Sequence, residues 1–183
     1  MSALLILIAV IACFGLFYAS TYNKLVRAKN QIEEAGAAID TELKKRYDLV
    51  PNLVETVKGY AAHEKGTLEA VIQARNSAVA ATTRDEKEEA SKGFTTALRS
   101  LFALSEAYPD LKANSSFIDL QKQLSSIEED LKQSRKYYNA NVKLMNNLVQ
   151  SFPSNIVAGM AHYEPCKYLS IEEEAKQRVE VKF

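Results

Sequence analysis

A histidine followed by a glutamate is the residue pair in this chain most suggestive of chemistry. His63-Glu64 begins like the His-Glu-x-x-His motif of zinc proteases, in which two histidines one helical turn apart bind the metal. Position 67 is Thr67 rather than a second histidine, and His162 lies far along the chain without a companion ligand. The sequence also lacks a Ser-His-Asp or Cys-His grouping and a glycine-rich phosphate loop. We therefore expect no catalytic centre, no metal and no cofactor, and a hydrolase is the least favoured function.

Polar side chains that fall on apolar helix faces are the other unusual feature. One predicted helix begins at Asp48, and Glu64 and Arg75 interrupt its apolar stripe, which consists of Val50, Leu53, Val54, Val57, Ala61, Leu68, Val71, Ile72 and Val79. Asn141 interrupts the apolar face of another predicted helix. Burying a charge is costly unless it is paired. The favoured interpretation is an internal polar network that fixes how the helices align. The alternative is a surface, made by Tyr60, His63 and Glu64, that recognises a partner helix.

The elements that position these residues should all be helices. The chain has 183 residues with only 6 glycines and 4 prolines, and it is rich in strong helix formers. Lys plus Arg and Asp plus Glu both number 23, so the net charge is zero and a nucleic-acid partner is not expected. We predict an all-α fold, in which an N-terminal transmembrane helix continues into an antiparallel, four-helix-type bundle of long helices.

Residues 3–19 carry no charge and form the predicted membrane anchor. As a helix they span about 26 Å, close to one bilayer core, and Tyr18 and Tyr22 stand where interfacial aromatic residues are common. A cleaved signal peptide is disfavoured because no basic residue precedes the run. A lipoprotein is a further alternative, because the residues leading to Cys13 resemble a lipidation motif.

The orientation of the anchor follows from the basic residues that flank it. Lys24, Arg27 and Lys29 follow the apolar run, and none precedes it. The positive-inside rule then places the N-terminus outside and the body in the cytoplasm. The expected location is a bacterial inner membrane, crossed once.

The predicted helices of the body are separated by four breaks. Asp48 is a good N-cap and Pro51 fits the following first turn, so we predict that the chain reverses there. Residues 82–85 and Pro109 predict two more breaks, and Ser116 should cap the longest helix. That helix should end at Phe152-Pro153 and show coiled-coil-like spacing, with apolar residues every seven positions at Phe117, Leu124, Leu131, Tyr138, Met145 and Phe152.

The chain after the longest helix should form short elements. We predict a Ser154-capped turn over residues 155–161, a short helix near Ser170 and an extended tail at residues 179–183. The expected domain organisation is an anchor (1–21), a helical bundle (22–151) and a C-terminal region packed on the bundle or the membrane surface (152–183).

Two Tyr-Asn motifs occur at related places in the chain. Tyr22-Asn23, with Val26 and Asn30, is echoed by Tyr138-Asn139, with Val142 and Asn146. With the chain reversing at Asp48–Pro51, both motifs should lie roughly 35 Å from that turn and face each other near the bilayer. Residues 152–160 should then reach the membrane surface or close the open end of the bundle.

The sequence resembles the LemA family over nearly its whole length after the anchor. The motifs that carry the resemblance are Tyr22-Asn23-x-Leu25-Val26, Lys45-Arg46-x-Asp48-Leu49-x-Pro51-Asn52-Leu53-Val54, Val57-Lys58-x-Tyr60, His63-Glu64, Ala74-Arg75, Tyr138-Asn139-x-x-Val142 and Phe152-Pro153-Ser154-Asn155. The resemblance implies one N-terminal transmembrane helix, a short exterior N-terminus and a helical-bundle body, and no enzymatic activity is established for the family. The chain departs from the family in its tail, where residues 167–170 replace a Tyr-Phe-Glu-like cluster.

The favoured function is that of a non-enzymatic, membrane-anchored adaptor or scaffold. It would present residues 44–52, as the distal tip, and the bundle flank to other envelope proteins. The alternative is a membrane-shaping or lipid-interacting oligomer that acts through residues 152–160. Self-association through the longest helix or through Gly15-x-x-x-Ala19 is a further interpretation. The candidate interaction or polar-network residues are Tyr22, Asn23, Arg46, Asp48, Pro51, Asn52, Tyr60, His63, Glu64, Arg75, Tyr138, Asn139, Phe152 and Pro153.

Overall fold

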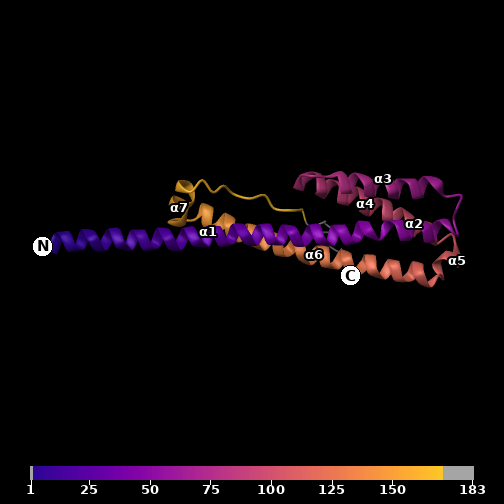
Figure 1. The fold of residues 1–183 in the computed structure, drawn as a ribbon, viewed down its shortest axis with the longest axis horizontal. Helices are drawn as coiled ribbons and strands as arrows, with labels where there is room; N and C mark the ends of the chain where they lie inside the picture. Colours follow the sequence, from indigo (N-terminus) through magenta and orange to yellow (C-terminus); the bar gives the residue numbers. More distant parts are fainter. Residues whose placement is uncertain (1, 171–183) are drawn as a thin grey trace, which may run out of the picture. The chain divides into compact units, whose positions relative to one another are not determined.

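The structure is a computed structural model that describes residues 2–170, and all the regular secondary structure in this range is helical (Figure 1). Its helices are α1 (Ser2–Asp48), α2 (Val50–Lys58), α3 (Lys65–Ala80), α4 (Arg84–Ser105), α5 (Pro109–Lys112), α6 (Ser115–Gln150) and α7 (Ser154–Met160). Among the described residues there is no strand. The predicted all-α fold of long antiparallel helices is confirmed.

The first part of α1 has the properties of a membrane span. In the part of the chain that the structure describes, it is the one helix long and apolar enough to cross a bilayer. Its large apolar side chains from Leu4 to Leu16 are each more than half exposed. Exposure of so many apolar side chains is costly in water and favourable in lipid. Residues 3–19 are therefore suited to a bilayer, as the sequence indicated.

The predicted chain reversal at Asp48–Pro51 is wrong. Leu49 keeps helical angles (φ −78°, ψ −18°), and its carbonyl accepts a hydrogen bond from the Leu53 amide at 3.1 Å. The chain therefore continues from α1 into α2, because Pro51 sits at the start of α2, where the helix tolerates a missing amide. The reversal comes at residues 59–64 instead, between α2 and α3.

The chain divides into two compact units, of which residues 39–133 form one. This unit holds α2 to α5 with the adjoining parts of α1 and α6, arranged as an antiparallel four-helix bundle (Figure 1). Its core is made of fully buried apolar side chains from every long helix, including Leu53, Val71, Phe94, Leu101, Phe117 and Leu131.

Helix α3 buries a different face from the one predicted. Ile72 and Val79, assigned to the apolar stripe, are 40% and 59% exposed. The predicted stripe assumed one continuous helix from Asp48, but a turn separates α2 from α3, which begins at Lys65. The side-chain directions in α3 therefore do not continue those of α2, and a different set of residues faces the core. Leu68, Val71 and Ala78 form that face.

The break predicted at residues 82–85 is confirmed, and it is built as a capping box. The Thr83 side chain accepts the Glu86 amide at 3.2 Å, and the Glu86 carboxylate accepts the Thr83 amide at 3.0 Å. The cap of α6 differs from the prediction, because Asn114 rather than Ser116 accepts the Phe117 amide, at 2.9 Å. Asn114 fills this role because α6 begins at Ser115, two residues earlier than a cap at Ser116 implies.

Residues 1–38 and 134–183 form the second unit, of which residues 2–38 and 134–170 are described. Its buried cluster joins α1, α6 and α7 through Leu25, Ala28, Met145, Val157 and Ala158. Phe152 is 81% exposed, against the seven-residue pattern that placed it in the seam, because α6 ends at Gln150.

The short elements after α6 are close to their predicted positions. Helix α7 covers the predicted turn, although Ser154 donates to the Ser151 carbonyl at 2.9 Å instead of capping the helix. Residues 163–170 have no regular secondary structure, and the predicted helix beyond Ser170 and the tail at 179–183 lie outside the described residues. The predicted boundaries at residues 21 and 151 stay predictions.

Candidate functional site

Arg46 lies in the core of the bundle rather than on its surface. It is 2% exposed, and its guanidinium donates to the Thr95 hydroxyl at 3.0 Å and forms an ion pair with Glu128. The same group lies 4.9 Å from the centre of the Phe94 ring, a cation–π contact. The buried charge is thus paired, and it joins α1, α4 and α6.

Arg75 donates a hydrogen bond to the Tyr47 carbonyl, whose usual helical donor is absent because residue 51 is a proline. In a continuous helix the amide of residue 51 would donate to the carbonyl of Tyr47, four residues earlier, but proline has no amide hydrogen. The Tyr47 carbonyl accepts the Arg75 Nε–H at 3.1 Å instead. A charged side chain of α3 therefore compensates for a proline at the α1–α2 junction.

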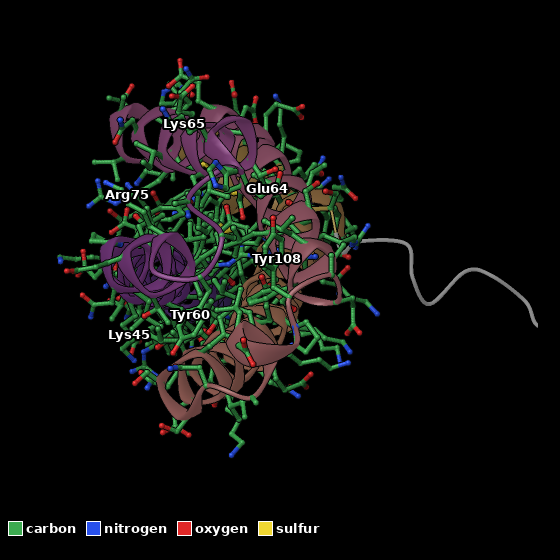
Figure 2. All side chains as sticks on the ribbon, turned by 90° about the vertical axis from the view of Figure 1, so that its right-hand side faces the viewer. Lys45, Tyr60, Glu64, Lys65, Arg75 and Tyr108 are labelled. Carbon is green, nitrogen blue, oxygen red and sulfur yellow. The ribbon has the colours of Figure 1, made fainter. Side chains whose placement is uncertain are left out.

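The reversal between α2 and α3 is held by two side-chain hydrogen bonds. Asn114 donates to the Tyr60 hydroxyl at 2.9 Å, and the Tyr108 hydroxyl donates to the Glu64 carboxylate at 3.1 Å. Figure 2 looks onto this end of the bundle, where Tyr60, Glu64 and Tyr108 lie. The hydrogen bond to Glu64 raises the pKa of Tyr108, because it stabilises the protonated phenol.

These contacts show where the predicted polar residues bind. Arg46, Arg75 and Glu64 each bind a group on another helix or turn, whereas the buried Asn141 donates to the Tyr137 carbonyl of its own helix at 3.1 Å. That these residues form a network that fixes how the helices align stays a prediction. Asp48, Pro51, Asn52 and His63 are exposed, and Asp48 pairs with Lys44 of the same helix at 2.5 Å. The reversal at residues 59–64, and not residues 44–52, is the tip of the hairpin that α2 and α3 form.

A shallow groove of about 350 Å³ lies on the same bundle, between α1 and the α3–α4 turn. Leu43, Tyr47, Ala78 and Val79 give it an apolar floor. Charges of both signs stand around that floor, from Asp40, Lys44, Asp48, Arg75 and Lys87. Asp40 is already paired with Arg84 at 3.2 Å and with Lys87 at 3.0 Å.

In the other unit, two asparagines of α6 hold the backbone of the segment after α7. The Asn146 side chain donates to the Cys166 carbonyl at 3.0 Å and accepts the Cys166 amide at 2.7 Å. Asn139 makes the same two bonds to Leu169, both at 2.9 Å. Burial raises the pKa of the Cys166 thiol, so the thiol stays protonated.

Comparison with known proteins assigns the fold to a family. The family model for the LemA family matches residues 35–183. The chain belongs to the LemA family. It is also similar to Protein LemA of Metamycoplasma hominis, with 28% identity over 159 residues, which cover 85% of this chain and 71% of that protein.

The LemA match includes the groove, the α2–α3 reversal and both asparagine clasps, but Tyr22 and Asn23 precede it. Tyr22 stacks on Tyr18, with ring centres 6.2 Å apart, and Asn23 is exposed. Tyr138 is half-buried. That the two Tyr-Asn motifs face each other stays a prediction.

Helix α7 and the residues just before it expose apolar side chains beside a buried patch. Phe152, Ile156 and Met160 are 81%, 46% and 59% exposed, whereas Val157 and Ala158 are buried. The cluster that contains Val157 also receives Phe17 and Tyr18, at the end of the apolar span. Pro153, next to Phe152, is exposed as well.

Sequence reasoning missed several residues that complete these sites. Asn114 and Thr95 lie outside the apolar patterns, but Asn114 stands directly before a long helix, the usual place of a cap. Tyr108 falls on an apolar stripe that begins at Ala90, and that position gives no sign of its hydrogen bond to Glu64. Asn146 was noted only as part of the Tyr-Asn echo. Among residues 2–170 no group of three or more His, Cys, Asp or Glu side chains is placed to hold a metal ion.

Proposed function

We propose that this LemA-family chain is a non-enzymatic, membrane-anchored adaptor whose body lies in the cytoplasm. The observation that carries the proposal is α1, a single helix that begins as an exposed apolar span and ends among buried core residues. Such a helix leads from the proposed span directly into the folded body. Lys24, Arg27 and Lys29, which follow the span, support the cytoplasmic side for the body.

The groove on α1 and α3 is the surface that suits a partner best. Val79 is 59% exposed on its floor, and the charges around it have both signs. This combination matches an amphipathic helix, which presents an apolar stripe flanked by charges of both signs. The partner is therefore expected to be another membrane protein that contributes such a helix.

Photo-crosslinking in intact membranes tests the groove. A photoreactive residue at Val79 should capture a helical segment of one partner through its apolar face. A photoreactive residue at Gln73, which is exposed on the same helix but does not line the groove, is the matched control. Lys44→Glu reverses one charge at the groove and should weaken capture. Equal capture at Val79 and Gln73, or capture that ignores Lys44→Glu, would contradict the groove as the docking surface.

A second function, contact with lipid, is favoured by α7. Its exposed Phe152, Ile156 and Met160 lie on an element whose buried side shares a cluster with Phe17 and Tyr18, at the end of the span. Apolar side chains at that level suit the interfacial layer of a bilayer.

The chain contains no tryptophan, so one introduced tryptophan is the sole source of tryptophan fluorescence. In liposomes with brominated acyl chains, the fluorescence of the tryptophan introduced by Phe152→Trp should be quenched. Tyr137→Trp is the control, because Tyr137 is also exposed but lies 15 residues earlier, or about 22 Å along the helix. Equal quenching of the two variants would remove the lipid role.

A further inference from the structure

The segment after α7 is bound to α6 as a peptide would be. We name residues 163–170 the strap; it has no regular secondary structure, and two of its residues are hydrogen-bonded to side chains of α6. Asn146 and Asn139 each hold one strap residue through both its amide and its carbonyl, at 2.7 to 3.0 Å. A side-chain amide that pairs with both groups of one residue reproduces the pairing of a β-ladder.

The two clasps match the geometry of a helix beside an extended chain. Asn139 and Asn146 are seven residues apart, which is about 10.5 Å along an α-helix. Cys166 and Leu169 are three residues apart, which is about 10 Å in an extended chain. The same spacing therefore lets each asparagine meet one strap residue without distortion of either element.

The clasps recognise main chain, and the strap side chains add apolar contacts. Leu169 is buried, and Cys166 packs against the cluster of α1, α6 and α7. Lys167 and Tyr168, between the two clasped residues, are exposed. A strap with this sequence is thus complementary to α6 whichever copy of the chain supplies it.

The turn that leads into the strap has a strained residue. His162 has φ 56°, in the left-handed region that favours glycine. Its amide donates to the Gly159 carbonyl at 3.2 Å and the Tyr163 amide donates to the Ala158 carbonyl at 3.0 Å, which closes the strap back on its own helix. Opening this turn releases the strain and frees the strap to reach another molecule.

We propose that the strap is exchanged between two copies of this chain, so that the strap of one copy occupies Asn139 and Asn146 of the other. Both clasps and the seat of Leu169 form again in the exchanged state, so the exchange replaces each contact by an identical one. The apolar span supports the second copy as occupant, because anchored chains share one plane and meet at a high local concentration.

Isotope mixing distinguishes exchange from closure within one copy. Full-length chains labelled with ¹⁵N are mixed with unlabelled chains in detergent, reconstituted in liposomes and treated with a lysine-reactive cross-linker. Lys143 lies between the two asparagines and Lys167 between the two clasped residues, and both are exposed. Mass spectrometry of the Lys143–Lys167 pair should find mixed-isotope peptides, approaching half of all pairs when every strap is exchanged. Pairs of one isotope only would overturn the proposal.

Two matched comparisons separate exchange from chance collision. Asn146→Ala should lower mixed-isotope pairs at least about fivefold, because two hydrogen bonds are lost. Asn147→Ala, at an exposed neighbour whose side chain makes no bond to the strap, should leave them unchanged. Mixed pairs that survive Asn146→Ala would be collisions and would overturn the proposal.

The turn supplies an independent readout. His162→Gly removes the strain of the closed turn and should reduce the mixed fraction, whereas His162→Val increases that strain and should raise it. Equal mixed fractions in the two variants would refute the role assigned to His162 and, with it, exchange through this turn.

Discussion

A double-mutant cycle can test whether Arg75 compensates for Pro51. Arg75→Met removes the donor to the Tyr47 carbonyl, and Pro51→Ala restores a backbone amide four residues after Tyr47. If the carbonyl needs only one of the two donors, the Arg75→Met variant should cost less stability when Pro51→Ala is also present.

The expected loss of stability in Arg75→Met follows from the hydrogen bond between Arg75 and the Tyr47 carbonyl. The Arg75 Nε lies 3.1 Å from the carbonyl and the residue is half-buried, so the hydrogen bond is charge-assisted but partly hydrated. Such bonds contribute about 1.5 to 3 kcal/mol, and we expect a loss near the lower end. With a backbone amide in place, the loss should fall to about 0.5 kcal/mol, which gives a coupling of about 1 kcal/mol.

The coupling is measured by urea unfolding of the detergent-solubilised chain, followed by circular dichroism. Lys87→Met is the control: Lys87 also lies at the groove, but it binds Asp40 at 3.0 Å and not the Tyr47 carbonyl. The loss of unfolding free energy caused by Lys87→Met should be the same with and without Pro51→Ala. A coupling between positions 51 and 75 within about 0.3 kcal/mol of zero would refute the compensation.

Three further predictions concern single sites. The Thr83 amide, followed by the Thr82 amide, lowers the pKa of Glu86 from 4.5 to about 2, so the contribution of Glu86 to stability is complete above pH 4.5 and is lost as the pH falls towards about 2. Glu86→Gln should therefore flatten acid unfolding in that window, whereas Glu89→Gln should not. Arg46→Ala should cost about 2 kcal/mol in urea unfolding, because it removes the hydrogen bond to Thr95, the contact with the Phe94 ring and the ion pair with the half-exposed Glu128, and a cost under about 1 kcal/mol would contradict the role of the buried guanidinium. In hydrogen exchange, Asn139→Ala should deprotect the Leu169 amide, whereas Asn147→Ala should leave it protected; equal protection in both variants would show that the clasp does not hold the strap.

Local signals in the sequence were enough for the helices and for the apolar helix that is a candidate membrane span. Few glycines and prolines predicted an all-α chain, and the uncharged run of residues 3–19 predicted the span. The turn residues at 82–85 marked a break that the capping box of Thr83 and Glu86 makes, because capping depends on neighbours in sequence.

The sites that depend on distant residues could not be predicted in this way. Pro51 is compatible either with a chain reversal or with two helices that continue in the same direction. Arg75, 24 positions later, donates to the Tyr47 carbonyl and so stabilises the continuous arrangement. The clasps at Asn139 and Asn146 were missed because recognition of backbone by an amide leaves no hydrophobic pattern. Their seven-residue spacing was the one available signal.

The unbroken α1 has a consequence for the lipid-facing surface of the anchor. A helix turns by about 100° per residue, so the direction of each anchor residue is fixed relative to Leu25, which is fully buried in the cluster with α7. Tyr18, Ile11 and Leu4, spaced by sevens from Leu25, drift by only about 20° per step and continue its line up the span. Gly15 and Ala19 point about 80° and 120° away from that line. The packing of Leu25 therefore sets the azimuth of the candidate span, and it directs the small residues to the side, where a second transmembrane helix would be able to approach closely.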